Sequence, residues 1–136
     1  MNFKTLVPEL IVNDINVSLS FYQGLGFKLE YQREAEKFAF VSLGGAQIML
    51  EQFHESGWNL GTLEPPFGRG VNFQIEVREI APLLTALEKM VHPLYREAKE
   101  TWRRVNTELI GETEFLVQDP DGYLLRFSQY VGSRPA

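Results

Sequence analysis

The chain has 136 residues, 44% of them hydrophobic and 12% aromatic, which is enough to form the core of one compact domain. Its formal net charge of -5 argues against a nucleic-acid partner, which requires a basic face, and the absence of cysteine excludes disulfides, thiolate metal sites and a cysteine nucleophile. No apolar run reaches membrane-spanning length and the amino terminus lacks a signal-peptide pattern, so we expect a cytoplasmic protein without a membrane partner.

The first half of the chain predicts a strand, a helix and three further strands. Thr5 to Val12 has the pattern of a strand, and Asp14 is a suitable helix N-cap. Apolar residues at helical spacing continue to Leu25, and Gly26 ends the helix. Alternating residues then predict a strand, a polar turn and a hairpin closed by two glycines, over residues 27–33, 34–37, 38–43 and 47–52.

A long connection that contains four glycines and a Pro-Pro pair follows, from His54 to Gly70, and connections of this length are often functional. The second half then repeats the order of the first. Its residues predict a strand, an amphipathic helix, a broken strand and a closing hairpin, over residues 70–77, 80–91, 94–105, 113–117 and 123–130. The turn of this hairpin is Asp-Pro-Asp-Gly, residues 119–122.

The two halves form a weak internal repeat, whose closing hairpins are FVSLGGAQIMLEQF and FLVQDPDGYLLRFSQY. We therefore predict one domain over residues 1–136, with a first module over residues 1–53, a connection over 54–69 and a second module over 70–136. The predicted fold class is α+β, in which two tandem βαβββ modules form a curved mixed sheet around a cleft, with the helices outside. The alternative is that the uncovered sheet faces pack together into a solid core.

The motifs at the two ends of the chain resemble those of the vicinal oxygen chelate superfamily. PELIVNDINVSLSFYQGLGF, the glycine pair before QIMLEQ, and FLVQDPDGYLLRFSQ carry this resemblance, which covers nearly the whole chain. The superfamily includes glyoxalase I, extradiol dioxygenases, fosfomycin-resistance enzymes and bleomycin-resistance proteins. The resemblance implies a fold, but it says little about function because the fold hosts many chemistries.

Metal enzymes of that superfamily carry histidine or glutamate at four positions on the first and last strands of the modules. By motif spacing, these positions correspond here to Val7, Met49, Asn72 and Arg126. None of these residues is a usual ligand for that metal site, and Arg126 is a cation that repels a divalent ion. Glu51 is the nearest carboxylate if the register of its strand differs. The departure from the pattern implies no metal, no cofactor and no catalytic residue.

The resemblance is closest to the bleomycin-resistance branch, whose members hold no metal of their own. Those proteins are homodimers that sequester a cationic, metal-chelating glycopeptide antibiotic in clefts formed with the partner chain. The resemblance therefore predicts an antibiotic-binding, homodimeric protein that carries out no catalytic step.

A flat heteroaromatic ligand requires aromatic faces, and a cationic tail requires acidic or polar partners. Trp102 is the first candidate because its context, KETWRRV, is polar, and Trp58 in the long connection is the second. One of the two phenylalanines in the first hairpin is expected to be a core residue. The predicted ligand-binding residues are Phe38, Phe40, Met49, Glu51, Trp58, Asn72, Trp102 and Arg126.

The strand period of two places further polar residues on the same concave faces, namely Glu9, Gln74, Glu76 and Ser128. Such an inventory is too polar for a dry core and favours a wet cleft. The alternative is a structural salt bridge between Glu9 and Arg126. Arg126 also suits an anionic ligand.

Two further functions remain open. One is a metal-dependent lyase, isomerase or dioxygenase of the same superfamily, with ligands at other positions. The other is a binder of a different small aromatic molecule. The sequence contains no nucleophile-elbow, P-loop or dinucleotide-binding signature, so hydrolase, kinase and nicotinamide chemistry have no basis in it.

Overall fold

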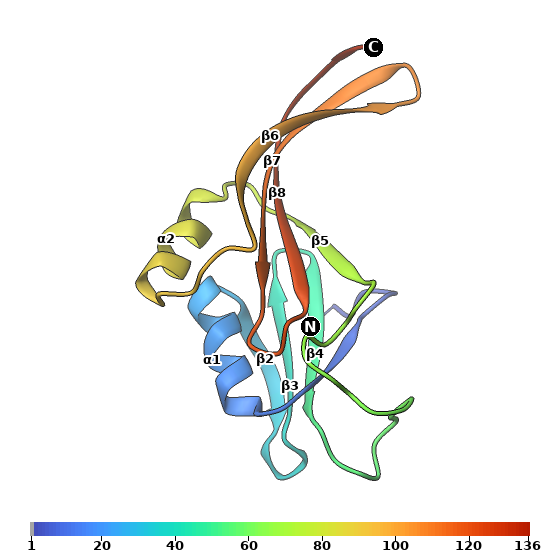
Figure 1. The fold of residues 1–136 in the computed structure, drawn as a ribbon, viewed down its shortest axis with the longest axis vertical. Helices are drawn as coiled ribbons and strands as arrows, with labels where there is room; N and C mark the ends of the chain where they lie inside the picture. Colours follow the sequence, from blue (N-terminus) through green and yellow to red (C-terminus); the bar gives the residue numbers. More distant parts are fainter. Residues whose placement is uncertain (1) are drawn as a thin grey trace. The chain divides into compact units, whose positions relative to one another are not determined.

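The computed structural model describes residues 2–136, which form two α-helices and eight β-strands (Figure 1). In chain order these elements are β1 (Glu9–Val12), α1 (Ile15–Leu25), β2 (Lys28–Arg33), β3 (Phe38–Leu43), β4 (Ala46–Gln52), β5 (Asn72–Glu76), α2 (Ala81–Lys89), β6 (Arg96–Val105), β7 (Glu108–Gln118) and β8 (Leu124–Pro135). The chain divides into two compact units. The first comprises the chain up to Phe67 together with the turn Asp119–Gly122, and the second comprises Gly68–Gln118 and Tyr123–Ala136.

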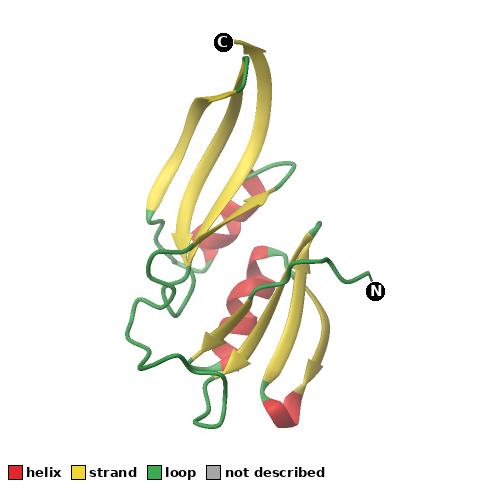
Figure 2. Cartoon of the chain, turned by 90° about the vertical axis from the view of Figure 1, so that its right-hand side faces the viewer, coloured by secondary structure: helices red, strands yellow, loops and turns green. Residues whose placement is uncertain are grey.

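The first unit contains a four-stranded sheet in the order β1-β4-β3-β2, with α1 on one face (Figure 2). Strand β1 runs parallel to β4, and the other neighbours are antiparallel. The Asp14 carboxylate accepts a hydrogen bond of 2.9 Å from the backbone N–H of Asn16 and so caps α1, as the sequence predicts. Gly26 ends the helix in the left-handed conformation, with φ of 110°.

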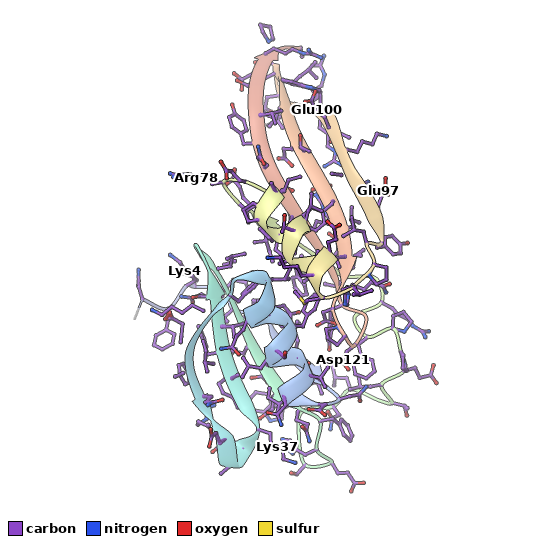
Figure 3. All side chains as sticks on the ribbon, turned by 90° about the vertical axis from the view of Figure 1, so that its left-hand side faces the viewer. Lys4, Lys37, Arg78, Glu97, Glu100 and Asp121 are labelled. Atoms are coloured by element: carbon purple, nitrogen blue, oxygen red, sulfur yellow. The ribbon has the colours of Figure 1, made fainter. Side chains whose placement is uncertain are left out.

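The second unit contains a four-stranded sheet in the order β5-β8-β7-β6, with α2 on one face (Figures 2 and 3). Phe115 and Phe127 are fully buried on the side of α2, and their rings stack at 5.4 Å between centroids. Leu83 and Leu87 are the buried residues of α2 itself. These apolar side chains form the core of this unit.

The predicted α+β fold of tandem βαβββ modules is confirmed, and each module forms its own mixed sheet. Strands β7 and β8 are longer than the sequence predicts, because their paired register runs from Gln118 and Leu124 out to Glu108 and Pro135. The added residues lack an apolar alternation, and pairing between neighbouring strands holds them extended. Within residues 2–136, neither helix combines the length and the apolar composition that a membrane crossing requires.

Candidate functional site

Strand alternation determines which residues lie on the open face of the first sheet. Leu10 and Leu50 are buried on the side that α1 covers, so the residues that alternate with them face away from the helix. Glu9, Met49 and Glu51 are these residues, and Glu9 lies directly opposite Met49 in the parallel register of β1 and β4. Two carboxylates from neighbouring strands therefore share one face.

Aromatic side chains cover the rest of this face. The Tyr31 ring stacks on Phe40 at 5.2 Å between centroids, and the Phe3 ring meets Phe40 edge-on at 5.5 Å. The Arg33 guanidinium lies 4.0 Å from the centroid of the Phe38 ring. These neighbours leave Phe38 and Phe40 only 3% and 2% exposed. A flat ligand can therefore reach the Phe38 ring only if Arg33 moves.

A pocket of about 230 Å³ opens beside Phe38, and we call it the Phe38 pocket. Its lining residues are Glu9, Arg33, Phe38, Glu51, His54, Ser56, Gly57 and Trp58. Trp58 is 92% exposed, so its indole faces are open to a ligand at the rim. Burial raises the pKa of Glu9, and the Glu51 carboxylate raises it further, against the charge of Arg33. The pocket thus combines two interacting carboxylates with an open aromatic ring.

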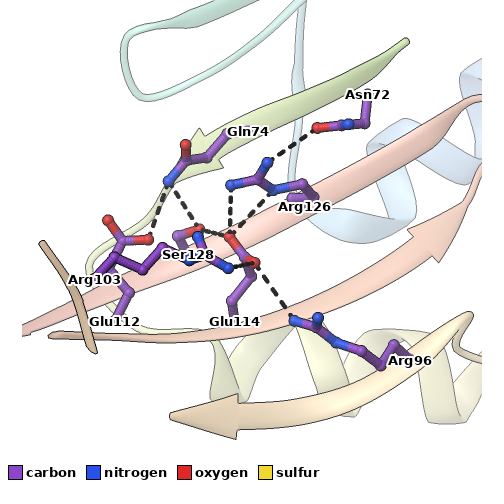
Figure 4. A network of polar contacts seen from close by, with 8 residues as sticks. All are labelled: Asn72, Gln74, Arg96, Arg103, Glu112, Glu114, Arg126 and Ser128. Carbon is purple, nitrogen blue, oxygen red and sulfur yellow. Dashed lines mark hydrogen bonds and ion pairs between the residues drawn. The ribbon is translucent and has the colours of Figure 1, made fainter. Parts of the chain in front are cut away.

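The open face of the second sheet carries a polar network centred on Glu114, which we call the Glu114 network (Figure 4). Its members are Asn72, Gln74, Arg96, Arg103, Glu112, Glu114, Arg126 and Ser128. The Glu114 side chain is only 2% exposed, and the hydroxyl of Ser128 donates a hydrogen bond of 2.6 Å to its Oε2. Arg126 donates to the same oxygen from Nε at 3.3 Å. A buried carboxylate is stable here because charged and polar donors surround it.

Two more arginines approach the other oxygen of Glu114. Nη2 of Arg96 lies 3.4 Å from Oε1, and Nη2 of Arg103 lies 3.8 Å from it. Burial alone would raise the pKa of Glu114, but the Ser128 hydrogen bond and the charges of Arg126 and Arg103 outweigh it, so that the pKa is lowered. Glu114 is therefore ionised at neutral pH.

Strand β5 completes the network on the side away from β6. The amide oxygen of Asn72 accepts a hydrogen bond of 3.2 Å from Nη1 of Arg126. The Gln74 amide donates to Glu112 at 3.1 Å. The carboxylate partner of Arg126 is therefore Glu114, which belongs to the same sheet. Glu114 lies on β7, two residues before Leu116, and Leu116 is the register partner of Arg126.

A register shift in β6 brings Arg96 to this network. Arg96 lies opposite Leu116, and Lys99 lies opposite Glu114, so three steps along β6 match two steps along β7. Without this irregularity, residues 96 and 99 would point to opposite faces of the sheet. The shift places both cations on the face of Glu114.

Trp102 lies on the opposite face of β6 from Arg103, because adjacent strand residues alternate. Its indole packs directly over Gly111, where an added Cβ would come within 2.7 Å of the ring. The guanidinium of Arg134 lies 4.3 Å from the ring centroid. Packing on Gly111 and the contact with Arg134 therefore explain why a tryptophan occurs in a polar stretch of sequence.

The structure separates the predicted ligand-binding residues into groups. Phe38, Glu51 and Trp58 come together in the Phe38 pocket, whereas Phe40 and Met49 lie on the same face outside its lining. In the second unit, Asn72 and Arg126 are hydrogen-bonded to each other within the Glu114 network, and Trp102 lies on the other face of that sheet.

The sequence did not single out Glu114, Arg96 or Arg103, although they surround Arg126. The available signal is the alternation in Glu112 to Val117, ETEFLV, which puts glutamates on the face opposite Phe115. Arg33 was also missed, because only the folded sheet places it over Phe38.

The four positions at which the resemblance would place a metal do not fit one. The Asn72 amide oxygen is bonded to the cationic Arg126, and Met49 faces Glu9 across the strand pair without offering a hard oxygen or nitrogen ligand. Over residues 2–136, the His, Asp and Glu side chains form no group of three arranged to hold a metal ion. No step of the function proposed below therefore uses a metal bound at these positions.

The Asp-Pro-Asp-Gly turn packs against α1 as part of the first unit; Asp121 is labelled in Figure 3. Asp121 accepts hydrogen bonds from the Asn13 backbone at 3.2 Å and from the Ser18 hydroxyl at 3.3 Å. The Tyr22 hydroxyl donates to Asp119 at 2.8 Å. The turn thus serves a structural role in addition to closing the β7–β8 hairpin.

Replacing Asp121 by asparagine is expected to raise the melting temperature by a few degrees at pH 7. Burial raises the pKa of Asp121, and the charge of Asp14 adds to this effect, while hydrogen bonds from Asn13 and Ser18 oppose it. A carboxyl with a raised pKa contributes stability below its ordinary pKa, and this contribution is lost as the pH rises through the folded-state pKa. Asparagine preserves an oxygen acceptor, and its amide can donate to Ser18.

The measurement is thermal unfolding from pH 3 to pH 8, with Glu55→Gln as a control at an exposed acidic residue of the same unit. The gap between Asp121→Asn and wild type should close as the pH falls, and Glu55→Gln should track wild type. A variant that melts below wild type at pH 7 would contradict this prediction, and a deficit at pH 7 that disappears at low pH would show that the charge of Asp121 stabilises the turn.

Two comparisons relate the chain to known proteins. A family model described as "Glyoxalase/Bleomycin resistance protein/Dioxygenase superfamily" matches residues 5–127. A solved structure of a member of that superfamily from Vibrio splendidus 12B01 is 38% identical, with 90% of this chain and 95% of that chain covered and a TM-score of 0.43. Among curated proteins, none matches the chain.

More distant structures are similar in fold. TioX from Micromonospora sp. ML1 is 16% identical, with 95% of this chain and 100% of that chain covered and a TM-score of 0.69. A glyoxalase/bleomycin resistance protein/dioxygenase from Alicyclobacillus acidocaldarius is 18% identical, with 95% and 92% covered and a TM-score of 0.65. Both likenesses extend over the two modules.

Proposed function

Because the chain belongs to the glyoxalase/bleomycin resistance protein/dioxygenase superfamily, we propose that it sequesters a cationic, planar aromatic antibiotic of the bleomycin type and carries out no catalytic step. The observation that carries this proposal is the composition of the Phe38 pocket. Glu9 and Glu51 supply two carboxylates at its wall, and the exposed indole of Trp58 supplies a stacking surface at its rim.

The electrostatics of the pocket suit a cation. Burial and the mutual repulsion of the two carboxylates raise the pKa of Glu9, and a bound cationic group would relieve that repulsion. Trp58 adds a face for cation–π or aromatic contact, which is worth roughly 0.5–1 kcal/mol at an exposed site. Arg33 lies over Phe38 and must swing aside before a flat group can stack on that ring.

The size of the pocket favours a second candidate ligand. At about 230 Å³ it is smaller than the roughly 300–1,000 Å³ of a typical drug-sized site. It therefore suits one aromatic ring system with a cationic substituent, either as part of a glycopeptide or as a smaller planar cation by itself.

The proposal includes a homodimer, in which a second copy extends the binding surface. Each sheet ends in edge strands, β1 and β2 in the first and β5 and β6 in the second, and such edges favour pairing with or coverage by another chain. Sedimentation of the purified chain tests this part, and a monomer at all concentrations would reject it.

The experiment is isothermal titration of chelator-treated protein with metal-free bleomycin, copper-loaded bleomycin and a smaller planar cation such as ethidium. We expect micromolar or tighter binding for at least one of them. Trp58→Ala should weaken it about fivefold through lost aromatic contact. The pair Glu9→Gln with Glu51→Gln should weaken it about tenfold through lost charge attraction.

Trp102→Ala is the matched control because the chain has only two tryptophans. In this variant Trp58 is the only indole, so ligand binding at the Phe38 pocket should still quench its fluorescence. If Trp102→Ala abolishes binding while Trp58→Ala does not, the ligand is bound by the second unit instead. If no compound binds at millimolar protein, the sequestering function is rejected.

A further inference from the structure

The Glu114 network carries more positive than negative charge. Three guanidinium groups, those of Arg96, Arg103 and Arg126, converge on the single carboxylate of Glu114. Lys99 is the register partner of Glu114 and lies on the same face of β6. The whole chain has a formal charge of -5, so this concentration of cations on one sheet face contrasts with the remainder of the protein.

The guanidinium groups differ in how far their hydrogen-bonding capacity is used. Arg126 donates to Glu114 from Nε and to Asn72 from Nη1, and its side chain is 24% exposed. Arg96 makes one long bond of 3.4 Å to Glu114, and Arg103 approaches it only to 3.8 Å. Each guanidinium has five N–H donors, so Arg96 and Arg103 retain donors for another acceptor.

These two arginines carry the more exposed guanidinium groups of the network, since the side chain of Arg126 is only 24% exposed. Their side chains are 42% and 54% exposed, whereas Glu114 beneath them is 2% exposed. Both Nη2 atoms lie within 4 Å of the same oxygen, Oε1 of Glu114, so one small anion can reach both guanidinium groups. Figure 4 shows Arg96 and Arg103 beside the Glu114 carboxylate. The buried carboxylate orients the two cations, and their side chains remain partly exposed.

We propose that Arg96 and Arg103 form a binding site for an oxyanion, a phosphate or carboxylate group of a small molecule, with Glu114 as the residue that positions them. A guanidinium presents paired N–H donors that match the two oxygens of such a group. Lys99 adds a further positive charge from the same strand. The site uses residues other than those of the Phe38 pocket, and it does not depend on the function proposed for that pocket.

The test is titration of the full chain with inorganic phosphate at constant ionic strength, followed by the NMR signals of the arginine Nε–Hε groups. We expect saturable binding in the millimolar range with shifts at Arg96 and Arg103. Arg103→Gln should weaken it about tenfold, the effect of one charge-assisted hydrogen bond. Arg103→Lys keeps the positive charge but lacks the paired N–H donors of a guanidinium, so phosphate affinity should fall less than in Arg103→Gln.

Arg104→Gln is the matched control. Arg104 is the next residue on β6 and points to the other face of the strand, where its Nη1 bonds the Asn106 carbonyl at 3.1 Å. This variant removes the same charge and should change phosphate affinity less than about twofold, because solvent and salt screen an exposed charge beyond the contact. Unfolding curves of all variants establish that each is folded.

Acetate and citrate are titrated in parallel to identify the preferred oxyanion. Saturable binding of phosphate or of a carboxylate, weakened about tenfold in Arg103→Gln and less than about twofold in Arg104→Gln, supports the site. Equal loss in the two variants would show a general charge effect, and the absence of saturable binding of any of these anions would show that the cations only hold Glu114. Either of these results overturns the proposal.

Discussion

Glu114→Gln is expected to lower the free energy of unfolding by about 3 kcal/mol at pH 7, the cost of removing one partner from a buried ionic network. The carboxylate is 2% exposed and is the common acceptor for Ser128 and Arg126. Glutamine retains the shape but replaces one acceptor oxygen by a donor, which then faces guanidinium groups. Three guanidinium groups would remain close together without the negative charge that now offsets their mutual repulsion.

The pH dependence of this loss follows from the lowered pKa of Glu114. A carboxyl with a lowered pKa contributes stability above its ordinary pKa, and this contribution disappears as the pH falls through the folded-state pKa. The stabilities of wild type and Glu114→Gln should therefore converge on acidification, because the wild type loses stability. Wild type and Asp121→Asn also converge on acidification, but there the raised pKa of Asp121 adds to the stability of the wild type.

Urea unfolding followed by circular dichroism measures both effects. Glu112→Gln is the matched control, because Glu112 lies on the same face of β7 but is only partly buried and accepts from Gln74. Its expected cost is below about 1 kcal/mol, as for a single hydrogen bond near the surface. Equal costs for the two variants would contradict a central role for Glu114.

Gly122→Ala is expected to lower the stability of the first unit by about 3 kcal/mol, combining left-handed backbone strain with a steric clash. Gly122 has φ of 104°, in the left-handed region that side chains rarely adopt. An added Cβ would lie 2.5 Å from Cβ and 2.7 Å from Cα of Pro66. Backbone cannot yield as a flexible side chain can, so the turn would have to move away from that segment.

Gly44→Ala separates the two contributions. Gly44 also has a positive φ, 57°, but an added Cβ there would meet no atom within 4 Å. The control should cost about 1 kcal/mol, the strain contribution alone. Thermal and urea unfolding of both variants test this difference. If Gly44→Ala is as destabilising as Gly122→Ala, close packing of the turn is not the cause.

Local chemistry made the first helix predictable. Asp14 and Gly26 are a cap and a terminator whose effects depend only on neighbouring backbone, and both act as the sequence indicates. The alternation of apolar residues likewise predicted the strands that contribute to a core. The distal parts of β7 and β8 were not predicted, because pairing with neighbouring strands extends them where side chains carry no periodic signal.

The candidate sites depended on long-range geometry that the sequence does not contain. The register shift between Arg96 and Lys99 decides which cations reach Glu114, and nothing in the sequence of residues 96–99, REAK, predicts this shift. For Trp102, the polar context suggested a ligand contact, but Gly111 on the neighbouring strand supplies a packing partner that only the pairing reveals. A role of Trp102 in ligand binding stays a prediction.

The turn Asp119–Gly122 has a consequence for synthesis on the ribosome. It belongs to the first unit, yet it is translated about fifty residues after Phe67, where the rest of that unit ends. At roughly 5–20 residues per second, this is a delay of about 3–10 s. During this interval the nascent first module exists without the carboxylates that accept from Tyr22 and Ser18 in the finished protein. The amino-terminal half is made first, but it is completed only when the carboxy-terminal hairpin emerges.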